Sequence, residues 1–232
     1  MLARIKRELA RLGSSEKARN AERFFKTGKG EYAEGDVFLG VSMSDQRRIA
    51  RAYQHIPCSD IKALFVSTVH EHRMVGGLIL AEQFLAADFQ QQTTLFDFYV
   101  AHARRMNNWD LVDSTAPIFG RYLLTHRKPL LKKLATSDDL WERRIAIVAT
   151  YAGIKEHKFG ETLAVSEMLL SDTHDLIHKA VGWMLRELGK RDQKTLELFL
   201  KKHYNNIPRT TLRYAIERFP EKKRKRYLSG TF

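Results

Sequence analysis

The chain has 232 residues, 44% of them hydrophobic and 29% charged, which is enough for one sizeable core or one extended array of helices. Its 40 Lys and Arg outnumber its 27 Asp and Glu, and the net charge of +13 favours polyanionic partners such as nucleic acid or an anionic membrane surface. The single Cys58 excludes an internal disulfide framework, and no apolar run reaches the roughly 18 to 20 residues that span a bilayer, so we expect a soluble, cytoplasmic protein.

Apolar residues recur at three- and four-residue spacing along nearly the whole chain, and no convincing pair of strands is present. The segment Met1–Leu12 predicts a first packed helix, because Glu8 interrupts its basic face and no cleavage signature follows. Thr27–Asp36 carries three glycines without the spacing of a phosphate loop, so it predicts a connecting loop. Further apolar stripes predict helices over 44–54, 59–70, 73–87, 93–105, 139–151, 161–170, 175–189, 193–203 and 209–218.

Short polar residues mark where several of these helices are expected to begin, because their side chains can accept a hydrogen bond from the first free backbone N–H groups. The predicted N-caps are Ser14, Ser44, Ser59, Ser137 and Asp172. Ser44 is followed by Arg47 where a capping box has an acid, so a cap without a box is expected there.

A weak internal repeat is also present, in which a basic residue leads a run of small and apolar residues. It occurs at Arg73, Arg144, Lys179 and Arg213, and the last two steps are 35 and 34 residues long. Paired helices at such a period predict an all-α, HEAT-like repeat α-solenoid. The recurring basic position could line a basic concave face and follow a phosphate backbone, or it could be a solvated surface position.

The most informative segment is Asn108–Asp113, which places an aromatic ring and a carboxylate four residues apart. Trp109 and Asp113 would project from one helix face. An acid beside a ring that can lie against a cation suits the breaking of a glycosidic bond, which develops positive charge on the sugar. The alternative is an ordinary half-buried Trp beside a surface Asp.

The other candidate functional segments give weaker evidence for a function. The segment His70–His72 lacks the spacing of a metalloprotease motif, so no metal site is expected. Asp110 faces away from Trp109 and is interpreted as structural. The basic tail Glu221–Arg226 is interpreted equally as a DNA contact or as a solvated terminus. Aromatic side chains expected in the core are Phe96, Phe98, Tyr99 and Trp141.

Four segments in order give the chain a family resemblance. They begin at Phe38-Leu-Gly-Val41, Asn108-Trp109, Leu140-Trp141 and Ile177-His-Lys179. From about residue 21 onward the chain resembles the AlkD-type alkylpurine DNA glycosylases, HEAT-like repeat proteins of DNA alkylation repair. It departs from them in a longer stretch at Thr27–Asp36, and in Phe24 where the family has a Tyr that approaches DNA.

The resemblance implies a monofunctional glycosylase of base excision repair that releases N3- and N7-alkylated purines from double-stranded DNA. It would need no cofactor and would act as a monomer, folded as a single domain over residues 1–232. The resemblance places the active site at Trp109, Asp113, Arg144 and Trp183. DNA contacts are expected from Arg47, Arg48, Arg143, Lys179, Arg186 and Arg213.

Two other classes of function stay open at this point. One is a catalytically silent HEAT-like protein that recognises unusual DNA structure, and a silent relative should have lost some of the four active-site residues. The other is a protein-interaction scaffold, because most helical solenoids bind proteins. The basic charge of the chain disfavours the scaffold.

Overall fold

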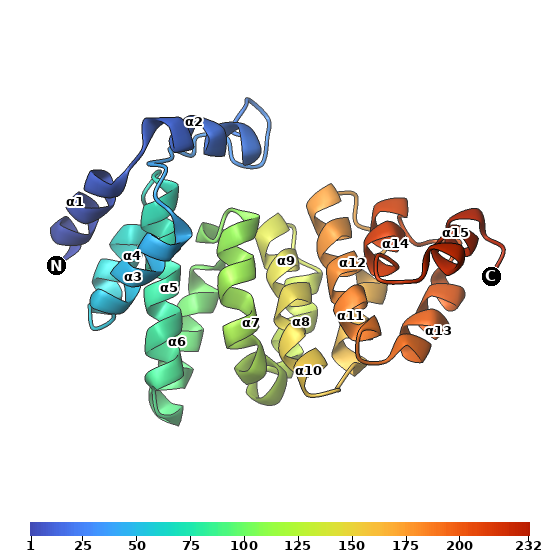
Figure 1. The fold of residues 1–232 in the computed structure, drawn as a ribbon. Helices are drawn as coiled ribbons and strands as arrows, with labels where there is room; N and C mark the ends of the chain where they lie inside the picture. Colours follow the sequence, from blue (N-terminus) through green and yellow to red (C-terminus); the bar gives the residue numbers. More distant parts are fainter. The chain divides into compact units, whose positions relative to one another are not determined.

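A computed structural model describes residues 1–232 and shows an all-α chain in which several consecutive helices pack against each other, consistent with a HEAT-like repeat α-solenoid. The chain divides into two compact units, residues 1–115 and 116–232. The helices are α1 Leu2–Leu12, α2 Ser15–Phe24, α3 Met43–Ala52, α4 Cys58–Phe65, α5 His70–Ala86, α6 Phe89–Ala101, α7 Trp109–His126, α8 Lys128–Ala135, α9 Leu140–Ala149, α10 Tyr151–Lys155, α11 Gly160–Met168, α12 Asp175–Gly189, α13 Gln193–His203, α14 Arg209–Ala215 and α15 Glu221–Ser229 (Figure 1). Among the consecutive helices that pack against each other are α4 with α5, α8 with α9 and α12 with α13. No helix is both long and apolar enough to cross a membrane.

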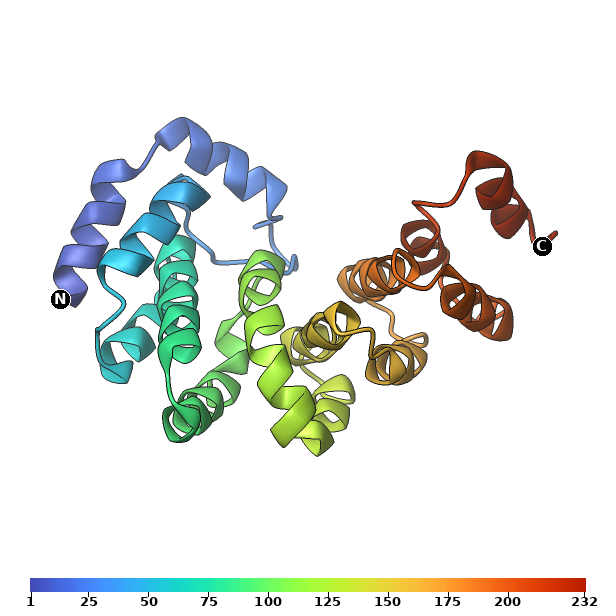
Figure 2. The same cartoon turned by 60° about the horizontal axis from the view of Figure 1, so that its bottom comes forward.

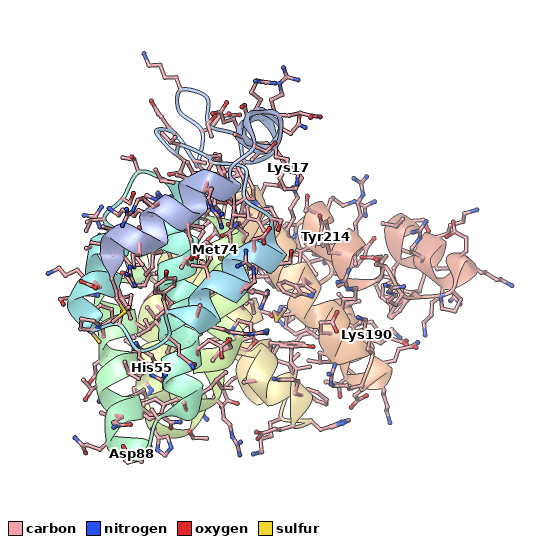
Figure 3. The ribbon with its side chains drawn as sticks, turned by 60° about the vertical axis from the view of Figure 1, so that its left-hand side comes forward. Lys17, His55, Met74, Asp88, Lys190 and Tyr214 are labelled. Carbon is pink, nitrogen blue, oxygen red and sulfur yellow. The ribbon has the colours of Figure 1, made fainter.

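Helix α5 is the centre of the first unit. It packs against α3, α4 and α6, and α1 lies against it as well. Met74 of α5 is 1% exposed, and Figure 3 shows it behind α1 and α3. Because neighbours surround the helix, even its charged first turn is buried, including Glu71 and Arg73. Gly76 lets α4 approach closely, since a Cβ there would lie 3.1 Å from Leu64 Cβ.

The first turn of α5 anchors the irregular stretch that precedes α3. The carboxylate of Glu71 accepts hydrogen bonds from three consecutive backbone N–H groups, those of Leu39, Gly40 and Val41, the closest at 2.8 Å. Gly40 has φ +76°, and a Cβ there would lie 2.3 Å from the carbonyl oxygen of Ser14. The path of this segment therefore depends on a buried carboxylate and on one glycine.

Replacing Glu71 with Gln should destabilise the protein by about 1–3 kcal/mol, because an amide is a weaker acceptor and brings its own N–H donors to a buried site. Urea unfolding followed by circular dichroism measures the change. Glu16→Gln on the exposed first turn of α2 is the matched control, and we expect it to change stability by less than about 0.5 kcal/mol. Equal effects of the two substitutions would contradict this role of Glu71.

In the second unit α9, α12 and α14 lie side by side, with α8, α11 and α13 as their partners (Figure 2). Glycines allow the close approaches. A Cβ at Gly120 would lie 2.2 Å from the carbonyl oxygen of Ala149, and one at Gly182 would lie 2.5 Å from Tyr214 Cβ. Small residues at these crossings fix which helix faces are buried and which side chains reach the surface.

The structure confirms the all-α prediction and the predicted first helix, and it corrects several helix starts. Ser14 is the N-cap of α2 as expected. The other four predicted caps are each wrong by two residues, because the helix begins two residues earlier or later than the polar side chain suggested; the N-caps are Ser42, Pro57, Asp139 and His174. The helices α8, α10 and α15 were not predicted, and the single-domain expectation stays a prediction.

Candidate functional site

Trp109 and Asp113 lie where the sequence pattern placed them, on the first turns of α7. Asn108 precedes the helix, fully buried, and its side-chain oxygen accepts a hydrogen bond from the Trp109 backbone N–H at 2.8 Å. This contact fixes the start of the helix, and both side chains remain partly exposed. The spacing of four residues therefore does present the ring and the carboxylate on one helix face.

The indole of Trp109 is held by contacts from the segment that follows α2. Its ring stacks on Phe25 with centroids 5.2 Å apart and 28° between planes, and the edge of Phe24 approaches at 5.8 Å. Its Nε1–H donates to the hydroxyl of Tyr32 at 3.2 Å. Phe24 is 66% exposed, so an aromatic surface continues outward from Trp109. Sequence reasoning missed Phe25 and Tyr32, although the local density of aromatic residues was a signal.

The same stack continues inward to a buried histidine. Phe25 lies on Phe38 at 5.2 Å, and Phe38 lies on the ring of His70 at 4.6 Å. His70 is 3% exposed, and its Nε2 lies 2.9 Å from a carboxylate oxygen of Asp110. Asp110 is therefore structural, as the sequence indicated, but its partner was not foreseen.

Two further charged groups complete this buried cluster. His70 Nδ1 lies 3.7 Å from Asp36, a separation typical of a charge pair, and Arg73 contacts the same carboxylate at 2.6 Å. Burial alone would lower the pKa of His70, but the charge and hydrogen bond of Asp110, helped by Asp36, outweigh it and raise the pKa to about 9. His70 is thus protonated at neutral pH, and the two cations balance the two carboxylates.

Behind Asp113 lies a buried pair of hydroxyl groups. The hydroxyls of Tyr99 and Thr115 are 3.1 Å apart, and both residues are 1% exposed. Burial raises the pKa of the Tyr99 phenol, and the negative charge of Asp113 adds to that rise. The phenol therefore stays neutral, so the ionisable group that this part of α7 presents to solvent is the Asp113 carboxylate.

In the second unit Arg144 of α9 is buried rather than displayed. It is 4% exposed, and its Nη1 donates to the backbone carbonyl of Leu176 at 2.5 Å. Arg143 is also engaged, with Asp172 at 2.6 Å and with the carbonyls of Ser137 and Asp138, each at 3.0 Å. The contacts of Arg143 support a role in joining α9 to the loop before α12 more than a role in contacting DNA.

Trp183 of α12 is half-buried and forms an aromatic pair with Tyr151. The two rings lie nearly parallel with centroids 6.5 Å apart. Two cations flank the Tyr151 ring, Lys155 at 5.6 Å and Arg191 at 5.9 Å from its centroid. Aromatic faces beside cations are suited to a sugar–phosphate backbone, because the rings pack on the sugar while the cations meet the phosphate.

The other predicted DNA contacts differ in their surroundings. Arg47 and Arg213 are exposed and have no ionic partner, whereas Arg48 pairs with Asp45 at 2.9 Å. Arg186 pairs with Glu217, and Lys179 with Asp175 at 2.7 Å. Arg73, the first member of the basic repeat, is 3% exposed, so the repeat does not mark a uniform phosphate-binding row.

No group of His, Cys, Asp or Glu side chains is arranged to hold a metal ion. A hollow of about 420 Å³ lies between the turn after α3 and helices α5 and α6, lined by Gln54, His55 and Gln83 among others, and contains none of the predicted catalytic residues.

The fold and these residues define a HEAT-like all-α protein with an acidic and aromatic candidate site. Over residues 5–219 the chain matches the model of the DNA alkylation repair enzyme family, and it belongs to that family. No curated protein matches it.

Two solved structures show the same fold at low sequence identity. One is a protein of Enterococcus faecalis described as a predicted DNA alkylation repair enzyme, with a TM-score of 0.67, 16% identity, and 90% of this chain and 97% of that one covered. The other is smu.31 from Streptococcus mutans UA159, with a TM-score of 0.58, 17% identity, and coverages of 77% and 93%.

Proposed function

We propose that the protein is a monofunctional DNA glycosylase that hydrolyses the N-glycosidic bond of cationic N3- and N7-alkylated purines in duplex DNA. The observation that carries the proposal is the pair on α7, where Trp109 is held by Phe25 and Tyr32 one helical turn from the carboxylate of Asp113. Membership of the DNA alkylation repair family supports an enzyme acting on alkylated DNA.

The chemistry follows from the substrate. A purine alkylated at N3 or N7 carries positive charge, which weakens the glycosidic bond and leaves oxocarbenium character on the deoxyribose. Asp113 opposes that charge and positions the attacking water. Trp109 offers an aromatic face to the cationic sugar, and the family resemblance assigns the same role to Trp183. Arg144 binds a neighbouring phosphate, for which its side chain must turn outward, because in the free protein it is 4% exposed and donates to the Leu176 carbonyl.

Release of 3-methyladenine and 7-methylguanine from methylated duplex DNA tests the proposal most directly. The expected result is a free methylated base and an abasic strand that stays intact until alkali is added. A purified, folded protein that binds DNA without releasing base would instead be the silent recognition protein. A protein that neither binds DNA nor releases base would favour the interaction scaffold.

The proposal predicts different effects for the two neighbouring arginines of α9. Arg144→Ala should weaken both DNA binding and the single-turnover rate, because it removes the proposed phosphate contact. Arg143→Ala should matter less for both and should appear mainly as lower stability, because its partners are Asp172 and backbone carbonyls. Anisotropy, single-turnover excision and urea unfolding separate these effects, and equal losses of activity would show that the phosphate contact is misplaced.

Binding to undamaged duplex should be strong at low salt and fall steeply as salt rises, because the chain carries a net charge of +13. If ~6 phosphates are neutralised, affinity should drop on the order of a thousandfold between about 50 and 200 mM salt. Fluorescence anisotropy measures this. Binding that is independent of salt would remove the electrostatic part of the proposal.

Two triple variants that remove the same amount of positive charge distinguish phosphate contacts made by α1 from the effect of the net charge on DNA affinity. Arg4, Arg7 and Arg11 line one hollow on α1 with Glu8 and Tyr53, and none of the three is ion-paired. Replacing these three with Ala should make the slope of log affinity against log salt concentration shallower, by the equivalent of about two to three phosphate contacts. The control replaces three exposed cations that are each paired with a glutamate, Lys128, Lys158 and Lys202.

A further inference from the structure

Two buried histidines lie two residues apart on the first turn of α5 and have opposite electrostatic surroundings. His70 stands between the carboxylates of Asp36 and Asp110, with Arg73 beside Asp36. His72 instead has the hydroxyl of Ser67 at 2.8 Å from its Nδ1. Burial, with smaller contributions from Lys6 and Arg73, lowers the pKa of His72 to about 4, so this ring is neutral.

His70 reaches Trp109 by two separate routes. The first route runs through the backbone. The hydrogen-bond partner of His70 is Asp110, the residue that follows Trp109 in the chain, and their 2.9 Å contact fixes the first turn of α7. The second is the aromatic stack, in which His70 supports Phe38 and Phe25, and Phe25 supports the indole. Phe25 also contacts the His70 ring directly, with centroids 5.2 Å apart.

We propose that His70 is a positioning residue of the candidate active site, and that its positive charge holds Trp109 in place through Asp110 and the Phe25–Phe38 stack. The inference rests on the proposed glycosylase function for its catalytic consequence. It does not need that function for its structural consequence, because the orientation of Trp109 can be measured in the free protein.

Charge balance explains why the cation is needed. With His70 protonated, Asp36 and Asp110 face two cations, His70 and Arg73, and the buried cluster is neutral. Loss of the His70 proton leaves one uncompensated negative charge shared by Asp36, whose side chain is 4% exposed, and Asp110, whose side chain is 19% exposed, and this is unfavourable because the site is largely shielded from water. Rearrangement of Asp110 or of the Asp36 loop then relieves it, and both segments support Trp109.

The pH dependence has a definite sign. The pKa of His70 in the folded protein is about 9, above the 6.5 of a free histidine, so its contribution is complete below 6.5 and is lost as pH rises through 9. The charged groups that face His70 are Asp110 from α7, Asp36 from the loop between α2 and α3, and Arg73 from α5 itself. We therefore expect an alkaline decline of the excision rate near pH 9 that depends on His70.

The experiment compares His70→Gln with the matched variant His72→Gln. Both remove a buried imidazole from the same helix turn, but only the first removes a charge beneath Trp109. His70→Gln should slow single-turnover excision roughly tenfold or more, as expected for a displaced reacting group, while DNA affinity changes less than about twofold. It should also abolish the decline near pH 9, and His72→Gln should leave rate and pH profile unchanged.

A second measurement reports Trp109 without catalysis. The chain has three tryptophans, so replacing Trp141 and Trp183 with Phe leaves Trp109 as the only indole fluorophore. In that background, acrylamide quenching of Trp109 should rise as pH passes through about 9. His70→Gln should increase the quenching at neutral pH and remove this pH dependence, and His72→Gln should do neither. If the unaltered chain releases no base, the glycosylase proposal fails, and this measurement still decides the role of His70.

Asp110→Asn covers the case in which His70→Gln does not fold. It keeps the shape of the partner and removes its charge, so it should slow excision and increase quenching in the same direction. With His70→Gln folded, the double variant should lose less than the product of the two single losses, because both act through one contact. Unaltered rate and quenching in either folded single variant, or equal effects of His70→Gln and His72→Gln, would overturn the proposal.

Discussion

Replacing Asp113 with Asn should slow single-turnover base excision by roughly a hundredfold or more while leaving DNA affinity unchanged or slightly improved. The substitution keeps the size and shape of the side chain and removes the charge that opposes the oxocarbenium. Affinity does not suffer, because a carboxylate near DNA repels phosphate and an amide does not. Loss of rate without loss of binding is the signature of an interaction made mainly in the transition state.

The surroundings of Asp113 make this substitution easy to interpret. The side chain is only partly buried, and Asn has nearly the same size and shape. We therefore expect Asp113→Asn to leave the protein folded, which urea unfolding checks. Asp60→Asn on α4 serves as a control for the loss of one carboxylate. An Asp113→Asn protein that retains full excision would remove this residue from the mechanism.

The sequence predicted those features of the fold that depend on local periodicity. The apolar stripes identified most helices, because each must bury one face against its neighbours whatever those neighbours are. Exact helix starts were harder, because Ser42 and Ser44 are chemically equal caps and only the packing selects Ser42. The short basic α15 escaped the pattern, although Tyr227 anchors it with 1% exposure.

The pair Trp109 and Asp113 was predictable for the same reason, because their spacing is a property of one helix. The support beneath them was not. Phe25, Phe38 and His70 come from three separate segments joined by loops, and no local pattern indicates that their rings stack. Arg73 shows the converse error, because a basic residue in a repeat looked exposed and is in fact paired with Asp36 in the interior.

The range of accepted lesions should follow the charge of the base more than its shape. Duplexes with 7-methylguanine, uracil or hypoxanthine at one position are compared under single-turnover conditions. We expect release of 7-methylguanine, with uracil and hypoxanthine released at least about a hundredfold more slowly, a difference of roughly 2.7 kcal/mol in barrier. The same comparison should show no strand cleavage, since the proposed chemistry uses water and no lysine Schiff base.

The physical reason lies in the leaving group. A purine alkylated at N3 or N7 discharges its positive charge as the glycosidic bond breaks, so it supplies its own activation. Uracil and hypoxanthine leave as anions unless a general acid or several hydrogen-bond donors meet them at the base. The groups around α7 act at the sugar instead, through the carboxylate of Asp113 and the face of Trp109. Efficient release of uracil or hypoxanthine would require donors at the base, and the charge-driven mechanism would then have to be abandoned.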